Sequence, residues 1–250
     1  MLLSAHLAGC CRGWLQLLPA LLVSLFLLVP GEWGICGAFE PHVYQSTNGV
    51  RLPYQLHIPE PLDSSKQYPC ILFLHGAIAR GDDNREPLNW GPLLIRSNSL
   101  KVGLPCFIVA PQCPKTGSWM TPIAGKGTEP IQLAVSLVKN ELPKAFKVDL
   151  SKCYITGVSM GGIGLWDFIC EQPGVFAAAV PVCSAGSPNK VTAAAAKYPV
   201  WVFHSDDDHL IPVQSARSMV QAWKGKGGEA RYTEYKGVRH SSWKPAYAEA

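Results

Sequence analysis

A serine stands between two glycines in the segment Gly157–Gly161 (GVSMG), where an apolar, β-branched run gives way to a helical pattern. A serine at such a strand-to-helix turn is held in a strained corner that exposes its Oγ, and the next backbone N–H points at the same reacting atom. The glycines are needed because the tight turn leaves no room for a Cβ. The spacing predicts that Ser159 is a nucleophile and that the N–H of Met160 stabilises an oxyanion. The alternative is an ordinary turn that happens to carry a serine.

A serine hydroxyl is a weak nucleophile at neutral pH, so it needs a general base and a carboxylate that orients the base. In folds with such a serine turn, the order along the chain is serine, acid, histidine. Three consecutive aspartates follow an apolar run before Pro212, and His240 follows the next apolar run. We expect His240 to be the base. Asp208 is the preferred acid because it comes late on its loop, and Asp206 is the alternative.

A second oxyanion donor is expected from the loop that follows the first central strand, Leu74–Asn84. The N–H of Ala77 is the candidate, because backbone donors aimed at the developing negative charge stabilise the transition state of acyl transfer. The dipeptide His75-Gly76 before it is weak evidence by itself.

These residues must be positioned by a sheet. Asn48-Gly49 predicts a hairpin between strands His42–Ser46 and Arg51–His57. Short, nearly continuous apolar runs follow at Cys70–Leu74, Cys106–Ala110, Tyr154–Gly157, Ala177–Val182, Val200–Phe203 and Tyr232–Tyr235. Such runs are typical of strands buried on both faces, and long intervening helices predict parallel pairing.

Helical patterns lie at Ile131–Phe146, which Pro143 should bend or end early, at Ile163–Cys170 and at Val213–Lys224. The fold class is therefore α/β, with a mostly parallel central sheet, an antiparallel N-terminal hairpin and helices on both faces. Ser241–Ala250 is too short for a complete final helix, so we expect that helix to be missing.

The first 38 residues differ from the rest. Arg12 is the only charged residue before the uncharged stretch Leu17–Val29, and small residues follow. This pattern predicts a signal peptide over residues 1–38 with cleavage near Ala38, a single domain over residues 39–250, and a secreted protein. The alternative is a membrane anchor formed by residues 14–29.

Six cysteines follow this leader, at positions 70, 106, 113, 153, 170 and 183. An even number in a secreted chain favours a disulfide bond, with buried free thiols as the alternative. Three of them begin predicted strands, which would place them along one rim of the sheet. No cysteine–histidine spacing of a zinc site is present, so we expect no metal. The net charge of +4 forms no basic block, which gives no support for nucleic-acid binding.

Several separated motifs together resemble one family. They are Phe73–Ala77 (FLHGA), Arg80–Asn84 (RGDDN), Ala110–Pro114 (APQCP), Gly157–Gly162 (GVSMGG), Pro199–His204 (PVWVFH) and Tyr232–Trp243 (YTEYKGVRHSSW). The chain is similar to the α/β-hydrolase group of predicted peptidases, which itself resembles phospholipase/carboxylesterases and polyhydroxybutyrate-depolymerase-like esterases. The resemblance implies a triad of Ser159, Asp208 and His240. Residues 77–80 read AIAR, where the group usually has AGER.

The sequence therefore predicts a secreted serine hydrolase that forms an acyl-enzyme on Ser159. A small-molecule or polymeric ester is the expected substrate, because no feature of a peptide-binding cleft is recognisable, and no cofactor is expected. Trp119 and Trp243 are expected to serve ordinary packing rather than an acyl pocket. Two alternatives remain: a serine peptidase of the same fold, and a non-catalytic α/β-hydrolase domain used for binding. The oligomeric state is left open.

Overall fold

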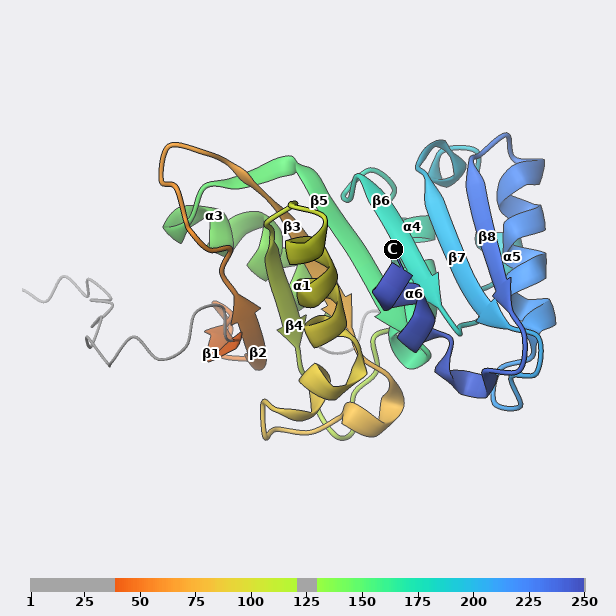
Figure 1. The fold of residues 1–250 in the computed structure, drawn as a ribbon, viewed down its shortest axis with the longest axis horizontal. Helices are drawn as coiled ribbons and strands as arrows, with labels where there is room; N and C mark the ends of the chain where they lie inside the picture. The colour runs from red at the N-terminus through yellow and green to blue at the C-terminus, as the bar shows by residue number, and fades with distance from the viewer. Residues whose placement is uncertain (1–38, 121–129, 250) are drawn as a thin grey trace, which may run out of the picture. The chain divides into compact units, whose positions relative to one another are not determined.

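Among the described residues, the apolar runs of the sequence form a sheet of eight strands in the order β1-β2-β4-β3-β5-β6-β7-β8 (Figure 1). The computed structural model describes residues 39–120 and 130–249, so the predicted leader lies outside the described residues. The strands are β1 (Phe39–Gln45), β2 (Arg51–His57), β3 (Tyr68–Leu74), β4 (Phe107–Pro111), β5 (Val148–Val158), β6 (Ala178–Val182), β7 (Val200–Ser205) and β8 (Ala230–Tyr235).

Strands β1 and β2 form the predicted antiparallel hairpin, and β2 also pairs antiparallel with β4. The remaining strands pair in parallel. Parallel strands align their carboxyl ends, so the segments after β3, β5, β6, β7 and β8 meet at one edge of the sheet. The predicted site residues lie on these segments.

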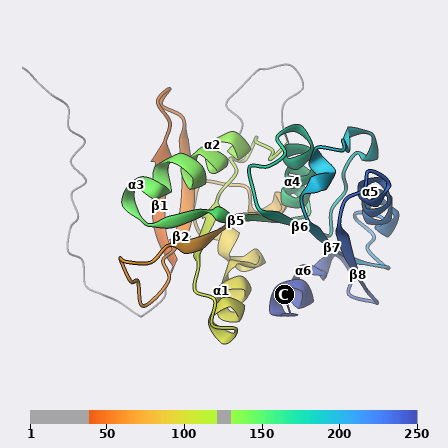
Figure 2. The ribbon, with the colours of Figure 1, turned by 90° about the horizontal axis from the view of Figure 1, so that it is seen from above.

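Helices cover both faces of the sheet (Figure 2). The helices are α1 (Pro92–Lys101), α2 (Pro130–Ser136), α3 (Leu142–Ala145), α4 (Met160–Glu171), α5 (Val213–Gly225) and α6 (Trp243–Glu249). Helices α1 and α6 lie on one face, and α2, α3 and α4 lie on the other. Helix α5 packs beside α4, where the rings of Trp166 and Trp223 are 5.5 Å apart. The predicted fold class is confirmed.

The helix predicted over Ile131–Phe146 does not simply end at Pro143. A π-helical segment, Leu137–Glu141, follows α2, and the short helix α3 then contains Pro143 near its start. Proline has no N–H and its ring clashes with the carbonyl four residues earlier. The wider π turn lets the chain pass this position and resume a helix. Of the two predicted effects of Pro143, a bend or an early end, the early end was therefore wrong.

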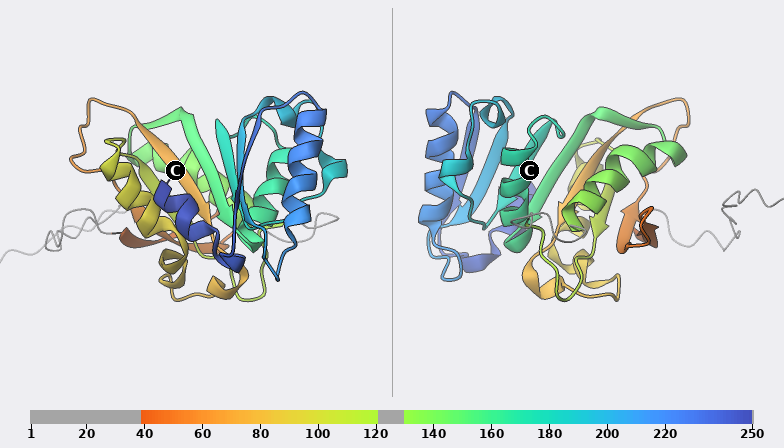
Figure 3. Two further views of the ribbon diagram at one scale, coloured as in Figure 1. Left: turned by 45° about the vertical axis from the view of Figure 1, so that its right-hand side comes forward. Right: turned by 180° about the vertical axis from the view of Figure 1, so that it is seen from behind.

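Helix α6 occupies the segment for which no complete final helix was expected, and it lies beside α1 (Figure 3). It buries Trp243, Ala246 and Tyr247 against the sheet. The Tyr247 hydroxyl forms a 2.8 Å hydrogen bond with the Thr156 hydroxyl, and burial raises the pKa of Tyr247. These contacts fix the chain that follows the predicted base, His240.

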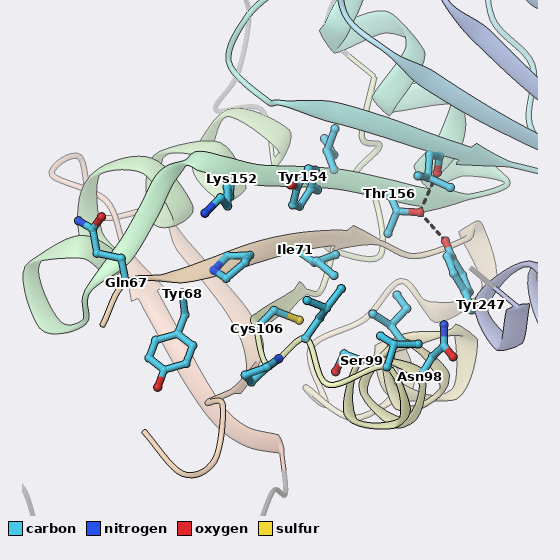
Figure 4. Close-up of a pocket in the computed structure, with 17 residues that line it drawn as sticks. Gln67, Tyr68, Ile71, Asn98, Ser99, Cys106, Lys152, Tyr154, Thr156 and Tyr247 are labelled. Atoms are coloured by element: carbon cyan, nitrogen blue, oxygen red, sulfur yellow. Dashed lines mark hydrogen bonds between the residues drawn. The ribbon is translucent and has the colours of Figure 1, made fainter. Parts of the chain in front are cut away.

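Next to Tyr247 of α6, an apolar groove of about 630 Å³ lies between α1 and strands β3, β5 and β6 (Figure 4). Ile71 and Tyr154 lie along it, the Thr156–Tyr247 hydrogen bond lies at one end, and Lys152 lies toward the other. Its lining comes from the face of the sheet rather than from the edge where the strands' carboxyl ends meet. This groove is therefore separate from the predicted chemistry.

All six cysteines after the leader are free and buried in the described structure. In the strand register, Cys70 lies opposite Cys153 on one side and opposite Phe107, the residue after Cys106, on the other. Cys70, Cys106 and Cys153 therefore share one rim of the sheet, as predicted. The expected disulfide bond is nevertheless absent there, and the alternative of buried free thiols holds. Burial raises the pKa of these thiols, for example that of Cys106 to about 11, so they carry no charge at neutral pH.

Candidate active site

Ser159 lies in the turn between β5 and α4 with a left-handed backbone, φ 55° and ψ −117°. Such a conformation costs a non-glycine residue about 1–3 kcal/mol, so the surrounding structure must impose it. The flanking glycines explain how. A Cβ on Gly157 would lie 2.5 Å from the carbonyl carbon of Gly161, and a Cβ on Gly161 would lie 2.0 Å from the Leu74 carbonyl oxygen. The strained turn that the sequence predicted at Ser159 is present.

His240 and Asp208 are joined by a 2.7 Å hydrogen bond from Nδ1 to Oδ2. The Asp208 side chain is fully buried, whereas that of His240 is 22% exposed. Because a carboxylate only accepts hydrogen bonds, the proton of a neutral His240 lies on Nδ1. This leaves Nε2 as the unprotonated nitrogen, which is the arrangement a general base requires.

The segment after β8 is joined to the end of β7 residue by residue. Backbone N–H groups donate from Gly237 to Asp206 Oδ1 (3.1 Å), from Val238 to Ser205 Oγ (3.2 Å) and from Arg239 to Asp207 Oδ1 (2.8 Å). The His240–Asp208 bond completes the series. Of the two acids that the sequence left open, Asp208 is therefore the one that contacts His240. Asp206 and Asp207 hold the segment that carries the histidine.

The loop of Ala77 is held by His75, which is fully buried. The His75 Nε2 accepts a hydrogen bond from the Cys113 N–H at 2.9 Å, so the Nδ1–H donates to the Gly76 carbonyl at 2.7 Å. Burial lowers the pKa of His75 to about 4, although the bond to the Gly76 carbonyl opposes this shift. The ring is therefore neutral at neutral pH, and its tautomer is fixed.

This arrangement orients the Gly76–Ala77 peptide. The Gly76 carbonyl accepts from His75 and also from the Ala79 N–H at 3.1 Å. In a trans peptide the next N–H points away from the carbonyl, so the Ala77 N–H points away from the His75 ring. The loop lies against the serine, since a Cβ built on Gly76 would be 3.5 Å from Ser159 Cβ. In the sequence, His75-Gly76 was weak evidence by itself, although a histidine directly after a buried strand is a signal.

Both tryptophans singled out in the sequence serve packing. Trp119 is fully buried, donates to the His75 carbonyl at 2.9 Å and stacks edge-on against the His75 ring. Trp243 is 9% exposed and packs against Trp90. Trp119 thus supports the Ala77 loop from behind.

The described residues contain no group of three or more His, Cys, Asp and Glu side chains that could hold a metal ion. None of the helices in residues 39–120 and 130–249 has the length and apolar character to cross a membrane.

Comparison with known proteins shows that the chain is similar to a hydrolase family and to several esterases. Residues 115–248 match the model of the dienelactone hydrolase family. The chain is 27% identical over 158 residues to the bifunctional acetylxylan esterase/xylanase XynS20E of Neocallimastix patriciarum, which covers 62% of this chain and 22% of that protein. A solved thermostable esterase is 36% identical, with a TM-score of 0.75, over 84% of this chain and 60% of that chain.

A second solved structure shares only the fold. It is a CE1 ferulic acid esterase from Anaeromyces mucronatus in complex with ferulic acid, 17% identical with a TM-score of 0.62, covering 87% of this chain and 90% of that one. The chain spans less than two thirds of the length of XynS20E and of the thermostable esterase. The family match includes Ser159, Asp208 and His240 and leaves Ala77 outside. The resemblance to α/β-hydrolases that the motifs indicated is confirmed.

Proposed function

The chain belongs to the dienelactone hydrolase family, and from this we propose that it is a serine hydrolase that cleaves carboxylic esters through an acyl-enzyme on Ser159. The observation that carries the proposal is the strained turn of Ser159 at the same sheet edge as the His240–Asp208 hydrogen bond. A backbone conformation this costly persists where a fold requires the side chain to be presented.

The proposed reaction has two steps. His240 Nε2 takes the proton of the Ser159 hydroxyl as Oγ attacks the ester carbonyl, and Asp208 stabilises the imidazolium that forms. The carbonyl oxygen becomes negative and accepts hydrogen bonds from the N–H groups of Ala77 and Met160. His240 gives its proton to the departing alkoxide, which leaves as the alcohol. His240 then takes a proton from water, whose oxygen attacks the acyl carbon. The bond from that carbon to Ser159 Oγ breaks, Oγ receives the proton from His240, and the carboxylic acid leaves.

Loops beside the proposed catalytic residues present large apolar side chains to solvent. Ile78 follows Ala77 and is 76% exposed, and Leu210 lies two residues after Asp208 and is 74% exposed. These are the highest exposed fractions among the large hydrophobic side chains of the described residues. An apolar substrate group would cover them, which favours esters with an apolar acyl part.

A cavity of about 300 Å³ begins one turn along α4 from Ser159. Ile163 and Trp166 line it together with Met120, Ser187 and Lys190. A cavity of this size has room for a short alkyl or single aromatic group. The names of the relatives, acetylxylan esterase and ferulic acid esterase, point to acetyl or aromatic acyl groups carried by carbohydrates. We propose such esters as the substrate class, on a small or polymeric alcohol.

The non-catalytic alternative depended on a displaced His240. The hydrogen bonds of residues 237–240 hold this segment in place and argue against that alternative.

A fluorophosphonate probe tests the proposal directly, because it labels activated serines covalently. The protein should be labelled, Ser159→Ala should not be labelled, and Ser64→Ala, which alters an exposed loop serine, should be labelled normally. Equal labelling of the Ser159→Ala variant, or none of the wild type, would refute the proposal.

The bond type is tested with nitrophenyl esters of increasing acyl length and with peptide anilides. We expect kcat/KM for esters to exceed that for anilides by several orders of magnitude, and the reverse order would establish the peptidase alternative. Ile78→Ser and Leu210→Ser should lower kcat/KM for octanoate more than for acetate. Leu150→Ser, which alters another exposed apolar side chain on β5, is the control and should leave this ratio unchanged.

We also propose that the protein is secreted, because residues 1–38 have the composition of a signal peptide. Amino-terminal sequencing of protein collected from the medium should begin near Phe39. A product that retains residues 14–29 and stays with the membrane would establish the anchor instead.

A further inference from the structure

The carboxylate of Asp208 is surrounded by donors. Its Oδ1 accepts hydrogen bonds from the backbone N–H groups of Leu210 at 2.9 Å and Ile211 at 3.0 Å. Its Oδ2 accepts from His240 and lies 3.3 Å from the Nε2 of a second histidine, His204. The side chains of His204 and Asp208 are both fully buried. One oxygen of the acid therefore faces two imidazoles.

The tautomer of His204 follows from its other contact. Its Nε2 lies 2.9 Å from the Ile211 carbonyl oxygen, which can only accept, so the proton of a neutral His204 lies on Nε2. Its Nδ1 is buried without a hydrogen-bond partner among the described residues, as suits an unprotonated nitrogen. The single N–H of His204 thus donates to the Ile211 carbonyl, and Asp208 Oδ2 lies 3.3 Å from the same nitrogen.

His204 stays neutral because burial lowers its pKa, although the Ile211 carbonyl and the Asp208 carboxylate act in the opposite direction. The titratable groups that face this pair are His240 from the segment after β8, Glu234 from β8 and Cys183 from the segment after β6. Glu234 lies opposite His204 in the strand register and is paired with Arg217. Asp208 is the carboxylate nearest the two imidazoles.

We infer that His204 is a positioning residue: its Nε2–H holds the Ile211 carbonyl, and its buried ring lies 3.3 Å from Asp208 Oδ2, where it sets how strongly Asp208 attracts the proton of His240. This inference rests on the proposed triad. A carboxylate oxygen that lies beside the N–H dipole of a second imidazole stabilises the His240 imidazolium less than one that faces His240 alone. The same N–H fixes the 208–211 loop, whose amides hold Oδ1. His204 touches no substrate and acts only through Asp208.

The test compares two variants of His204. In His204→Gln the side-chain amide nitrogen reaches about as far as Nε2 and keeps an N–H donor, whereas His204→Leu removes the donor. His209→Gln is the matched control, because His209 is an exposed neighbour of Asp208. The pKa of His240 is followed by NMR from its imidazole proton shifts, assigned by their loss in His240→Gln. This measurement does not depend on turnover.

In His204→Leu we expect the pKa of His240 to rise by about half a unit or more, because Asp208 Oδ2 then loses the N–H dipole beside it. The acid limb of the kcat/KM profile for nitrophenyl acetate should move to higher pH by the same amount, and kcat/KM should fall about tenfold. His204→Gln should restore most of both properties, and His209→Gln should match the wild type.

An unchanged His240 pKa in both variants, with equal losses of activity, would show that His204 only fills space and would overturn the inference. If His204→Leu does not fold, His204→Asn replaces it, because its shorter amide cannot reach Oδ2. Failure of the proposed function would look different: the wild type would then show no esterase turnover, or its turnover would persist in Ser159→Ala.

Discussion

His75 should make the free energy of unfolding fall as the pH falls, and one substitution should remove this contribution. The perturbation is His75→Asn. The asparagine amide can donate to the Gly76 carbonyl as Nδ1–H does, but it does not titrate. In the wild type, protonation of Nε2 would place two donors, the imidazolium and the Cys113 N–H, against each other. A protonated His75 is therefore incompatible with the folded loop.

The magnitude follows from the two pKa values. The ordinary pKa of histidine, 6.5, is lowered in the fold to about 4, chiefly by burial. Between these values the unfolded chain binds a proton that the folded chain does not, so the free energy of unfolding falls as the pH falls through this window. The contribution is fully present above pH 6.5, and its loss between pH 7 and pH 4.5 amounts to ~2 kcal/mol.

The assay is urea unfolding of the wild type and of His75→Asn at pH 7 and at pH 4.5. Other titrating groups, including buried His204, contribute to both proteins, so the difference between the two pH-induced changes isolates His75. The variant should be less stable at pH 7, because Cys113 loses its acceptor, yet it should lose about 2 kcal/mol less on acidification. Equal losses in both proteins would mean that His75 is not held neutral, and the account of the Ala77 loop would fail.

Three further results are expected. Asp208→Asn should lower kcat/KM by about 10⁴-fold and Asp206→Asn by less than about tenfold, as measured with nitrophenyl acetate; the opposite order would make Asp206 the acid. Gly161→Ala should prevent soluble folding or destabilise by more than about 3 kcal/mol, because its Cβ would strike the Leu74 carbonyl. Gly225→Ala, where nothing lies within 4 Å, should leave the urea midpoint nearly unchanged, and similar effects of both changes would contradict the packing argument. Finally, protein without the leader should show almost no reactive thiol when native and six in urea; fewer than six in urea would indicate a disulfide.

The strands could be predicted from the sequence because each is a short apolar run buried on both faces. The nucleophilic turn could be predicted because it is a local feature, fixed by Gly157 and Gly161 within five residues. Helix α1 was missed, since Pro92–Lys101 mixes apolar and polar side chains without a clear stripe. Its position comes from packing beside α6, more than 140 residues later in the chain.

The acid could not be chosen from the sequence because three adjacent aspartates differ only in direction. Their directions are set by the segment 237–240, whose residues lie 31 or 32 positions after the aspartates that they contact by hydrogen bonds. The role of His75 in orienting the Gly76 peptide was also beyond the sequence, since it depends on the Cys113 N–H across the sheet edge. Long-range hydrogen bonds, rather than residue types, decide these points.

The bonds between residues 205–208 and 237–240 link the His240–Asp208 pair to the edge of the sheet. Within the part of the chain that the structure describes, strand β8 is the last strand and pairs only with β7. Edge strands open locally at a lower free energy than the strands at the centre of a sheet. Amide hydrogens of β8 should therefore exchange by local opening while those of β3 and β5 remain protected. Each such opening separates the histidine from its aspartate, so heat should inactivate the protein by fraying of one strand before the fold as a whole is lost.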